Sequence, residues 1–326
     1  MKNSILNILK QSDDFISGEK LSEILKVSRT AIWKNINSLK EQGYEIESIT
    51  RRGYKLKSSP DKLSEQEILE GLKTKEVGKN IAYYDVIDST NKQAKIEAMG
   101  GADHGTIVVA EQQQSGKGRR GRWWSSPYGK GIWLSMILRC NIEPSKASMI
   151  TLVAGLAVCN VVKEITALDA KIKWPNDIVV NGKKVCGILT EMSMEISEID
   201  YIVVGIGINV NTDEFDTEIL DMATSLKKEA GKAFSRKQLL QNILLEFEKL
   251  YDIFMKTGDL TNLIEKYNER SINMGKYVKV INGNNVLVGK VENIDKEGQL
   301  IIITDNNEKH VIISGEVSVR GLYGYV

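Results

Sequence analysis

The period of the hydrophobic residues changes along this chain, and the change limits the folds open to it. Apolar residues recur at helical spacing up to Leu39, strands then mix with helices as far as residue 270, and from Lys276 onward the period is 2. A helical period predicts amphipathic helices, whereas alternation predicts half-buried strands. A chain of 326 residues has room for two or three domains. We therefore predict an α+β protein of three domains, at 1–60, 61–270 and 271–326.

The first domain is typical of a winged helix-turn-helix. Ser17 and Ser28 stand where they can cap two consecutive short helices, which a turn at residues 26 and 27 joins. The core residues that helical spacing predicts are Leu21, Ile24 and Leu25 on the first of these helices and Ile32, Ile36 and Leu39 on the second. A hairpin at 44–57 follows and is predicted to form the wing.

This domain is also locally basic. Between Lys26 and Lys57 the chain has eight Lys and Arg against three Glu, although the formal net charge of the whole protein is only +1. Phosphates attract such a face, and a recognition helix can then reach base edges. The alternative is a small helical dimerisation domain with a solvated basic face. We predict DNA binding, with contacts from Arg29, Thr30, Lys34, Arg51 and Arg52.

A loop rich in glycine and arginine is the strongest functional signal in the central domain. From Gly116 to Arg122 four residues are cationic and three are glycines. Cationic side chains beside exposed backbone N–H groups favour an anion such as phosphate or carboxylate. The spacing fits neither the G-x-G-x-x-G motif nor the P-loop. A solvated hairpin tip is the alternative, but exposing Trp123 and Trp124 is costly unless they stack on something. We predict a flexible loop that closes over an anionic ligand.

Three further stretches of this domain have residues suited to a polar ligand. The Ser-Thr-Asn run at 89–91 follows a strand; it either caps the next helix, which is the favoured interpretation of the run alone, or offers hydroxyl and amide groups to a ligand. Lys184 precedes a strand with Gly187, and an apolar strand with two glycines ends at Asn209, where glycines leave room for something flat or bulky. Strands and helices without a strict β-α-β order predict a mixed sheet with helices on one face.

The last domain predicts a small β-barrel. Short alternating strands, the last at 316–320, follow one another from residue 277 and are separated by turns rich in Asn, Gly and Asp. Five such strands within about fifty residues are typical of an SH3-like barrel. A barrel of this size has few core residues, so we expect it to pack against the central domain.

Cysteine, histidine and hydropathy exclude several other classes. Three cysteines without metal-type spacing indicate a reducing compartment and no disulfide framework. Two distant histidines, His104 and His310, argue against a zinc site and a His-based triad. Residues 149–165 are expected to be a buried helix. With no signal peptide and no apolar run of about 18 residues, we predict a cytoplasmic protein that does not contact a membrane.

The order of these features resembles one family, the bifunctional biotin–protein ligase that is also the biotin operon repressor. The resemblance rests on the winged helix, Ser-Thr-Asn, the loop after Gln113, Lys173-Trp174-Pro175-Asn176-Asp177, Lys184-Val185-Cys186-Gly187, the Gly-Ile-Gly-Ile-Asn run at 205–209 and the small barrel. It implies a two-step reaction. Biotin and ATP with Mg²⁺ give biotinyl-5′-AMP and pyrophosphate, and a lysine of a biotin carboxyl carrier protein then accepts the biotin.

The resemblance also implies roles for individual residues. The implied catalytic residues are Lys184 and Arg119. The implied biotin contacts are Ser89, Thr90, Asn91, Gln113, Lys117, Gly118, Arg119, Lys184 and Gly187. The implied nucleotide contacts are Arg122, Trp124, which stacks on adenine, Asp177, which is also near the Mg²⁺ ion, and Asn209. A second loop, at 215–223, is implied to order around the nucleotide.

Two residues depart from the family pattern. Lys117 stands where Arg is common, which keeps the charge but loses the bidentate fork. Cys186 stands where Ala is common and adds an oxidisable sulfur.

The resemblance further implies regulation. Adenylate-bound protein would form a homodimer through the central sheet and bind two-fold operator DNA, while carrier protein competes for the same surface. Two alternatives stay open. A lipoate–protein ligase runs the same adenylation on a related scaffold, although the arginine-rich loop and the winged helix speak against it. A ligand-responsive repressor without catalysis is the second.

Overall fold

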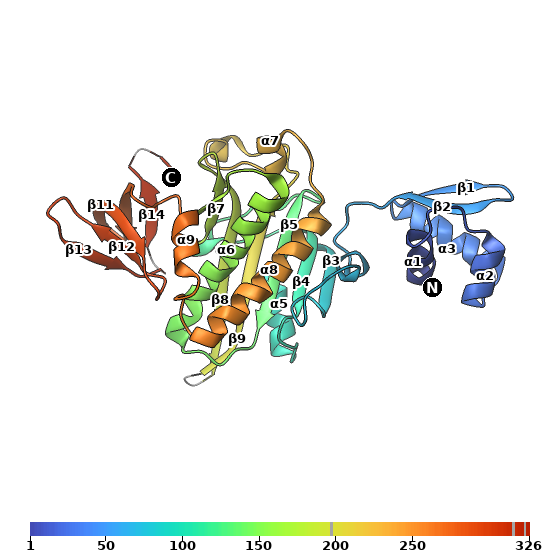
Figure 1. Ribbon diagram of the computed structural model, residues 1–326, viewed down its shortest axis with the longest axis horizontal. Helices are drawn as coiled ribbons and strands as arrows, with labels where there is room; N and C mark the ends of the chain where they lie inside the picture. The colour runs from blue at the N-terminus through green and yellow to red at the C-terminus, as the bar shows by residue number, and fades with distance from the viewer. Residues whose placement is uncertain (196–197, 315–316, 323) are drawn as a thin grey trace. The chain divides into compact units, whose positions relative to one another are not determined.

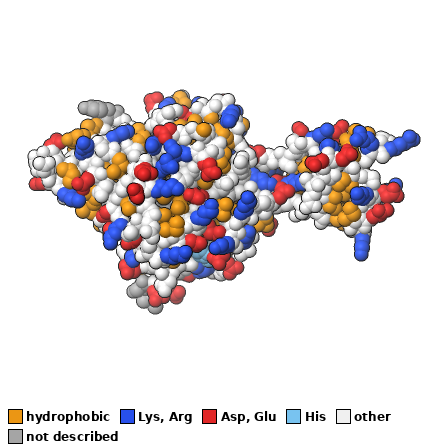
Figure 2. All heavy atoms as spheres, viewed as in Figure 1, with side chains coloured by type: hydrophobic (Ala, Val, Ile, Leu, Met, Phe, Trp, Pro, Cys, Tyr) orange, Lys and Arg blue, Asp and Glu red, His pale blue; other side chains and the backbone are white. Residues whose placement is uncertain are grey.

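In the computed structural model, which describes residues 1–195, 198–314, 317–322 and 324–326, the chain divides after Lys62 (Figure 1). The two units are Met1–Lys62 and Leu63–Val326. The finer division into three domains, with boundaries at residues 60 and 270, stays a prediction. On the face drawn in Figure 2, acidic and basic side chains are interspersed over the larger unit, as the near-neutral composition leads one to expect.

The first unit is a winged helix-turn-helix. Its elements are α1 (Lys2–Lys10), α2 (Gly18–Leu25), α3 (Arg29–Glu41), β1 (Glu45–Ile49) and β2 (Gly53–Ser58). The predicted caps are confirmed, because the Ser17 side chain accepts from the Lys20 N–H and that of Ser28 from the Ala31 N–H. The predicted core of α3 is confirmed. The prediction for Ile24 is wrong: it is 52% exposed, because this short helix buries only Leu21 fully.

The wing is tied to the helices through a backbone bridge. Ile16 and Tyr54 exchange two N–H···O hydrogen bonds of 2.9 Å, so β2 pairs with the segment before α2 as well as with β1. Gly53 allows this close approach, since a Cβ atom there would lie 2.1 Å from the Ile16 carbonyl oxygen. The tip at residues 50–52 therefore stands on a braced hairpin.

The second unit is built around a seven-stranded mixed sheet, as predicted. The strand order is β3, β4, β5, β9, β8, β7, β6, with bounds Ile81–Ile87, Ile107–Gln113, Gly131–Leu138, Glu198–Asn209, Lys183–Glu195, Asp177–Val180 and Lys171–Lys173. Only the β3–β4 pair is parallel among these described strands. The helices are α4 (Glu65–Leu69), α5 (Thr90–Met99), α6 (Ala147–Thr166), α7 (Leu226–Ala230), α8 (Arg236–Thr257) and α9 (Ile264–Arg270).

Helices cover both faces of this sheet. Val109 and Val204 share a core with the long helices α6 and α8, which lie across one face in Figure 1. Val108 and Val203, one position earlier on the same strands, pack with Ala94 of α5. Successive strand residues point to opposite faces, so α5 lies on the second face. The expectation of helices on one face is wrong in this detail, because the residues that α5 buries are small and leave a weak hydrophobic signal.

The longest helices follow their patterns closely. Helix α8 buries one apolar face along its length: Leu239, Leu240, Ile243, Leu244, Phe247, Leu250, Tyr251 and Phe254. The stretch Pro144–Thr166 is long and apolar enough to cross a membrane, which corrects the expectation that no such run exists. Its most apolar window is 72% buried inside the fold, as in the core helix expected here.

A tight turn joins two strands of the central sheet, and the cysteines form no disulfide among the described residues. Asn181 and Gly182, both at positive φ (49° and 76°), join β7 to β8 in the tight hairpin that Asn-Gly favours. All three cysteines are unpaired.

The last strands form a five-stranded antiparallel sheet. They are β10 (Tyr277–Asn282), β11 (Asn285–Ile294), β12 (Leu300–Ile303), β13 (Lys309–Ile312) and β14 (Ser318–Gly321), in the order β13, β12, β11, β10, β14. Glu316, the first residue of the last predicted strand, lies outside the described residues. The sheet shares its core with the central sheet, and the buried Trp174 donates its indole N–H to the Gly298 carbonyl at 3.0 Å. The expected packing against the central region is confirmed.

Candidate ligand-binding cavity

A cavity of about 620 Å³ opens over the central sheet, at the ends of β4, β8 and β9. All thirteen residues that the family resemblance associates with biotin or the nucleotide line it: Ser89, Thr90, Asn91, Gln113, Lys117, Gly118, Arg119, Arg122, Trp124, Asp177, Lys184, Gly187 and Asn209. They come from segments far apart in the sequence, so the fold brings the predicted set together.

Hydrogen bonds orient the polar side chains at one end of the cavity. The Gln113 Oε1 atom accepts from the Thr90 N–H at 2.9 Å and from the Thr90 hydroxyl at 3.0 Å. Ser135 donates to the Asn91 Oδ1 atom at 2.6 Å, and Asn91 donates to Glu191 at 2.9 Å. Bonds between protein groups thus hold these side chains, which lowers the cost of ordering them around a ligand.

Ser89 stands at the N-cap position of α5, yet its side chain makes no capping hydrogen bond. The favoured capping interpretation of the Ser-Thr-Asn run is therefore wrong for the serine side chain. Thr90 and Asn91 make the network hydrogen bonds instead, so the run contributes side chains to the cavity.

Backbone hydrogen bonds join the two ends of the Gly/Arg loop at 116–122. The Gly118 N–H donates to the Arg122 carbonyl at 2.7 Å, and the Trp124 N–H donates to the Gly116 carbonyl at 2.9 Å. Arg119 donates to Asn176 Oδ1 at 3.0 Å and to the Val317 carbonyl at 3.0 Å. Burial lowers the pKa of its guanidinium. The loop thus contacts the last sheet through an arginine.

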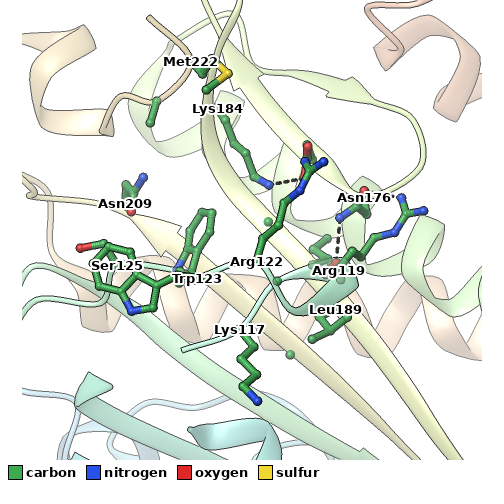
Figure 3. Close-up of a pocket in the computed structure, with 18 of the residues that line it drawn as sticks. Lys117, Arg119, Arg122, Trp123, Ser125, Asn176, Lys184, Leu189, Asn209 and Met222 are labelled. Carbon is green, nitrogen blue, oxygen red and sulfur yellow. Dashed lines mark hydrogen bonds and ion pairs between the residues drawn. The ribbon is translucent and has the colours of Figure 1, made fainter. Parts of the chain in front are cut away.

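Cations of this loop point to different parts of the cavity. Figure 3 shows Arg122 directed toward the same end as Lys184, whereas Lys117 points the other way and Arg119 points toward Asn176. Lys117 and Arg122 are exposed. A ligand that spans the cavity can therefore meet cations at more than one point along its length.

Trp124 packs against glycines of two neighbouring strands, Gly187 of β8 and Gly207 of β9. A Cβ atom at Gly207 would lie 2.5 Å from Trp124 Nε1, and one at Gly187 would lie 3.3 Å from Trp124 Cζ3. The flat group that these glycines were expected to admit is thus, in this structure, the protein's own indole. Its buried N–H has no hydrogen-bond partner among the described residues. An unpartnered buried donor is costly, and a ligand acceptor would relieve the cost.

Lys184 and Asp177 form an ion pair inside the cavity. Lys184 Nζ lies 2.6 Å from Asp177 Oδ1, and the Tyr325 hydroxyl donates to Asp177 Oδ2 (Figure 3 shows the Lys184 contact). Lys173 is 5% exposed, and its Nζ lies 3.4 Å from the centre of the Tyr325 ring. Burial, opposed by the charge of Asp177, lowers the pKa of Lys173 to about 8.

The second loop, at 215–223, lies along the cavity beside Lys184. The Lys184 N–H donates to the Met222 carbonyl at 2.7 Å, and the Thr224 N–H donates to the Lys184 carbonyl at 3.0 Å. Asn209 is buried and donates its side-chain amide to the Thr224 carbonyl at 3.2 Å. Hydrogen bonds therefore tie both the backbone of Lys184 and the side chain of Asn209 to the chain at residues 222–224.

The charge of the cavity is strongly asymmetric. The cations among its described lining residues are Lys117, Arg119, Arg120, Arg122, Lys173, Lys184 and Arg320, and the acids are Asp177, Asp216 and Glu218. Seven cations against three carboxylates leave a local charge of about +4 in a protein with a net charge of +1. Partly enclosed walls focus such a charge, so the cavity favours an anionic ligand.

Asp177 can serve Mg²⁺ only together with substrate oxygens. Among the described residues there is no cluster of three or more His, Cys, Asp or Glu that could hold a metal. Mg²⁺ is usually held by one or two carboxylates together with substrate phosphates, rather than by an all-protein cage. One carboxylate, that of Asp177, is therefore enough for an ion that arrives on a nucleotide.

Several cavity residues were not among the predicted contacts. Lys173 is the first residue of the Lys-Trp-Pro-Asn-Asp motif, so its place in that motif could have identified it as a residue of the site. Ser126 and Ser135 do not line the cavity, but they bond to side chains that do: Ser126 accepts from Gln113 Nε2 at 2.9 Å, and Ser135 donates to Asn91 Oδ1 at 2.6 Å. No local pattern in the sequence marks either serine. Tyr325 had no local signal, because it reaches Asp177 across 148 residues of sequence.

The predicted DNA contacts lie on the first unit and not at this cavity. Arg29, Thr30 and Lys34 are exposed on α3, and Arg29 pairs with Glu19. Arg51 and Arg52 are exposed at the tip of the wing. Trp33 is also exposed on α3, at 56%.

Comparison with known proteins agrees with this arrangement. Residues 83–209 match the model of the Biotin/lipoate A/B protein ligase family, residues 2–55 an HTH domain, and residues 274–320 the Biotin protein ligase C terminal domain. The chain is 41% identical to the bifunctional ligase/repressor BirA of Bacillus subtilis, over 95% of this chain and 96% of that protein. The chain belongs to the family of bifunctional biotin ligase/repressors. BirA of Escherichia coli K12 is 32% identical over 96% of this chain and 95% of its own.

Solved structures of biotin protein ligases have the same fold. The ligase of Aquifex aeolicus, in complex with biotin and ATP, aligns with a TM-score of 0.66 and 32% identity over 74% of this chain and 99% of its own. The predicted fold class and the family resemblance are therefore confirmed for this biotin ligase/repressor.

Proposed function

We propose that the protein activates biotin with ATP and transfers it to a lysine of a biotin carboxyl carrier protein. In the first step an oxygen of the biotin carboxylate attacks the α-phosphorus, the bond to the β-phosphate breaks, and pyrophosphate leaves. In the second step the acceptor amine attacks the carbonyl carbon of biotinyl-5′-AMP, loses a proton, and displaces AMP. The observation that carries the proposal is that one cation-lined cavity collects all thirteen expected residues.

The charge of the cavity suits the first step. A carboxylate and a triphosphate repel each other, and preorganised cations lower the barrier by cancelling that repulsion. We assign this role to Lys184 and Arg119, with Lys117 and Arg122 on the loop. Mg²⁺ bound with the nucleotide near Asp177 would neutralise further phosphate charge. Positioning of this kind needs no covalent nucleophile from the protein.

The two ends of the cavity suit the two parts of the adenylate. The hydrogen-bonded set of Thr90, Asn91 and Gln113 offers polar groups for the biotin head. Trp124 lies beside Lys184, whose Nζ is 5.1 Å from the indole ring centre, and Asn209 donates to Thr224, which follows the second loop. We place the adenine here. The mixed anhydride would hydrolyse in water, so closure of the loop at 116–122 protects it.

We also propose that the adenylate controls operator binding. The winged helix-turn-helix of the first unit carries the basic face expected for DNA, and adenylate-bound protein would pair into a homodimer that fits a two-fold operator. Ligand state would then set DNA affinity by a population shift. ATP, carrier protein and operator DNA meet in the cytoplasm, where unpaired cysteines are also usual.

Two assays test the ligase. Biotin-dependent ATP–pyrophosphate exchange reports the first step, and mass spectrometry of a carrier domain incubated with biotin and ATP reports the second. Absence of exchange would leave a ligand-responsive repressor without catalysis, and transfer of lipoate in preference to biotin would favour the related ligase. Lys184→Ala is expected to abolish exchange while the protein stays folded, and full exchange in this variant would remove Lys184 from catalysis.

A gel-shift assay tests the repressor. DNA upstream of biotin synthesis or transport genes should be bound more tightly when biotin and ATP are both present. An affinity that ignores the two ligands would exclude the proposed regulation and leave the ligase proposal intact.

A further inference from the structure

The chain after β14 returns to the ligand cavity. Tyr325 lines the cavity together with Val317 and with residues 318–320 of β14. The position is set by tight backbone packing: a Cβ atom at Gly321 would lie 2.1 Å from the Val326 carbonyl oxygen, and one at Gly182 would lie 3.2 Å from Val326 Cγ2. The neighbour of Tyr325 is therefore held against both β14 and the β7–β8 turn, which aims the tyrosine at the central sheet.

Tyr325 meets two charged residues of the Lys-Trp-Pro-Asn-Asp motif at once. Its hydroxyl donates to Asp177 Oδ2, and its ring lies under the Lys173 ammonium, with Nζ 3.4 Å from the ring centre. Hydrogen bonds to a charged acceptor are among the stronger ones in proteins, and an ammonium over an aromatic face gains further when it is desolvated. One side chain thus satisfies a carboxylate and a buried cation.

The Asp177 carboxylate connects Tyr325 to Lys184. Its Oδ1 atom is 2.6 Å from Lys184 Nζ, while Oδ2 accepts from Tyr325. With one oxygen fixed by the tyrosine, the carboxylate cannot turn freely, and the place where it holds the Lys184 ammonium is fixed as well. Small errors in the position of a catalytic charge cost large factors in rate.

We propose that Tyr325 is a positioning residue of the adenylation step, through which the last sheet sets the orientation of Asp177 and hence of Lys184. This inference rests on the proposed ligase function and adds to it a residue that acts through Asp177 and Lys184. It assigns to the C-terminal region a direct part in the arrangement of the catalytic cations.

Tyr325→Phe keeps the ring and removes only the hydroxyl. In biotin-dependent ATP–pyrophosphate exchange we expect kcat to fall about tenfold or more, as for loss of a hydrogen bond to a charged group, with the KM for biotin and the melting temperature close to wild type. Tyr277→Phe is the matched control, because Tyr277 donates to Asp305 at 2.8 Å on an exposed part of the same sheet. It should leave the exchange unchanged.

A double-mutant cycle separates positioning from a general structural role. If Tyr325 acts through Asp177, then Asp177→Asn combined with Tyr325→Phe should be no slower than Asp177→Asn alone. Additive losses, wild-type kcat in Tyr325→Phe, or an equal loss in Tyr277→Phe would each overturn the inference. Absence of exchange in the wild-type protein would instead refute the proposed function, so the two failures are distinguishable.

Discussion

Two glycines of β9 make room for two different side chains. We therefore predict that substituting one glycine weakens the binding of ATP and substituting the other weakens the binding of biotin. A Cβ atom at Gly205 would lie 2.0 Å from Asn91 Oδ1, and one at Gly207 would lie 2.5 Å from Trp124 Nε1. Non-bonded atoms are stable at about 3.5–4.0 Å, so each alanine must displace its neighbour by roughly 1 Å or more. The displaced residue is a proposed biotin contact in the first case and a proposed nucleotide contact in the second.

The expected size follows from the cost of overpacking. Extra methyl groups in well-packed sites cost ~1–3 kcal/mol, and each ~1.4 kcal/mol is tenfold in affinity, so the weakened step should lose about 5-fold to 150-fold. Gly207→Ala is expected to raise the KM for ATP and to leave the KM for biotin near wild type. Gly205→Ala is expected to do the reverse, because moving Asn91 also disturbs its 2.6 Å hydrogen bond from Ser135.

Pyrophosphate exchange measures both constants, with one substrate varied at saturation of the other. Gly155→Ala on α6 is the control, since its Cβ atom would meet Ile188 and Ile172 at 3.8 and 3.9 Å, which is ordinary contact. Alanine in a helix interior is favoured over glycine by up to ~1 kcal/mol, so the control should be at least as stable as wild type. The division of the cavity into a biotin end and a nucleotide end would be refuted by either of two results. One is an equal rise of the KM for ATP and the KM for biotin in each variant, and the other is a rise of the KM for biotin in Gly207→Ala and of the KM for ATP in Gly205→Ala.

Three further predictions concern stability, thiol chemistry and DNA. Arg236 is 1% exposed and pairs with the fully buried Glu111 at 2.7 Å. Arg236→Met should therefore lower the free energy of unfolding in urea by ~3–5 kcal/mol, and a loss below ~1 kcal/mol would contradict the burial argument. Burial raises the pKa of Cys159 to about 11. At pH 8 only about one such thiol in a thousand is ionised, so a thiol reagent should label this cysteine only after unfolding, and rapid labelling of native protein would refute this. Lys34→Ala should reduce the slope of log affinity against log salt for duplex DNA by about 1, measured by fluorescence anisotropy, and an unchanged slope would remove Lys34 from the phosphate contacts.

Local sequence was enough to determine most elements of this protein. The buried helix predicted at 149–165 lies within α6 (Ala147–Thr166), and the core residues predicted for α3 are buried. Ser17 and Ser28 cap the helices they were expected to cap. Caps, turns and hydrophobic periods act between residues close in the chain, so the sequence displays them directly. The thirteen ligand-site residues were collected by resemblance, because periodicity carries no information on which segments meet.

Only the tertiary structure decided which partners the buried and cavity groups find. Glu111 meets Arg236 across 125 residues, and Asp177 meets Tyr325 across 148. The space above Gly205 is filled by Asn91, from the first turn of α5. The space above Gly207 is filled by Trp124, which follows the loop at 116–122. Such contacts depend on the strand order of the central sheet and on how the last sheet packs against it. A charged or polar group takes whichever partner that packing brings within reach, and its neighbours in sequence do not determine that partner.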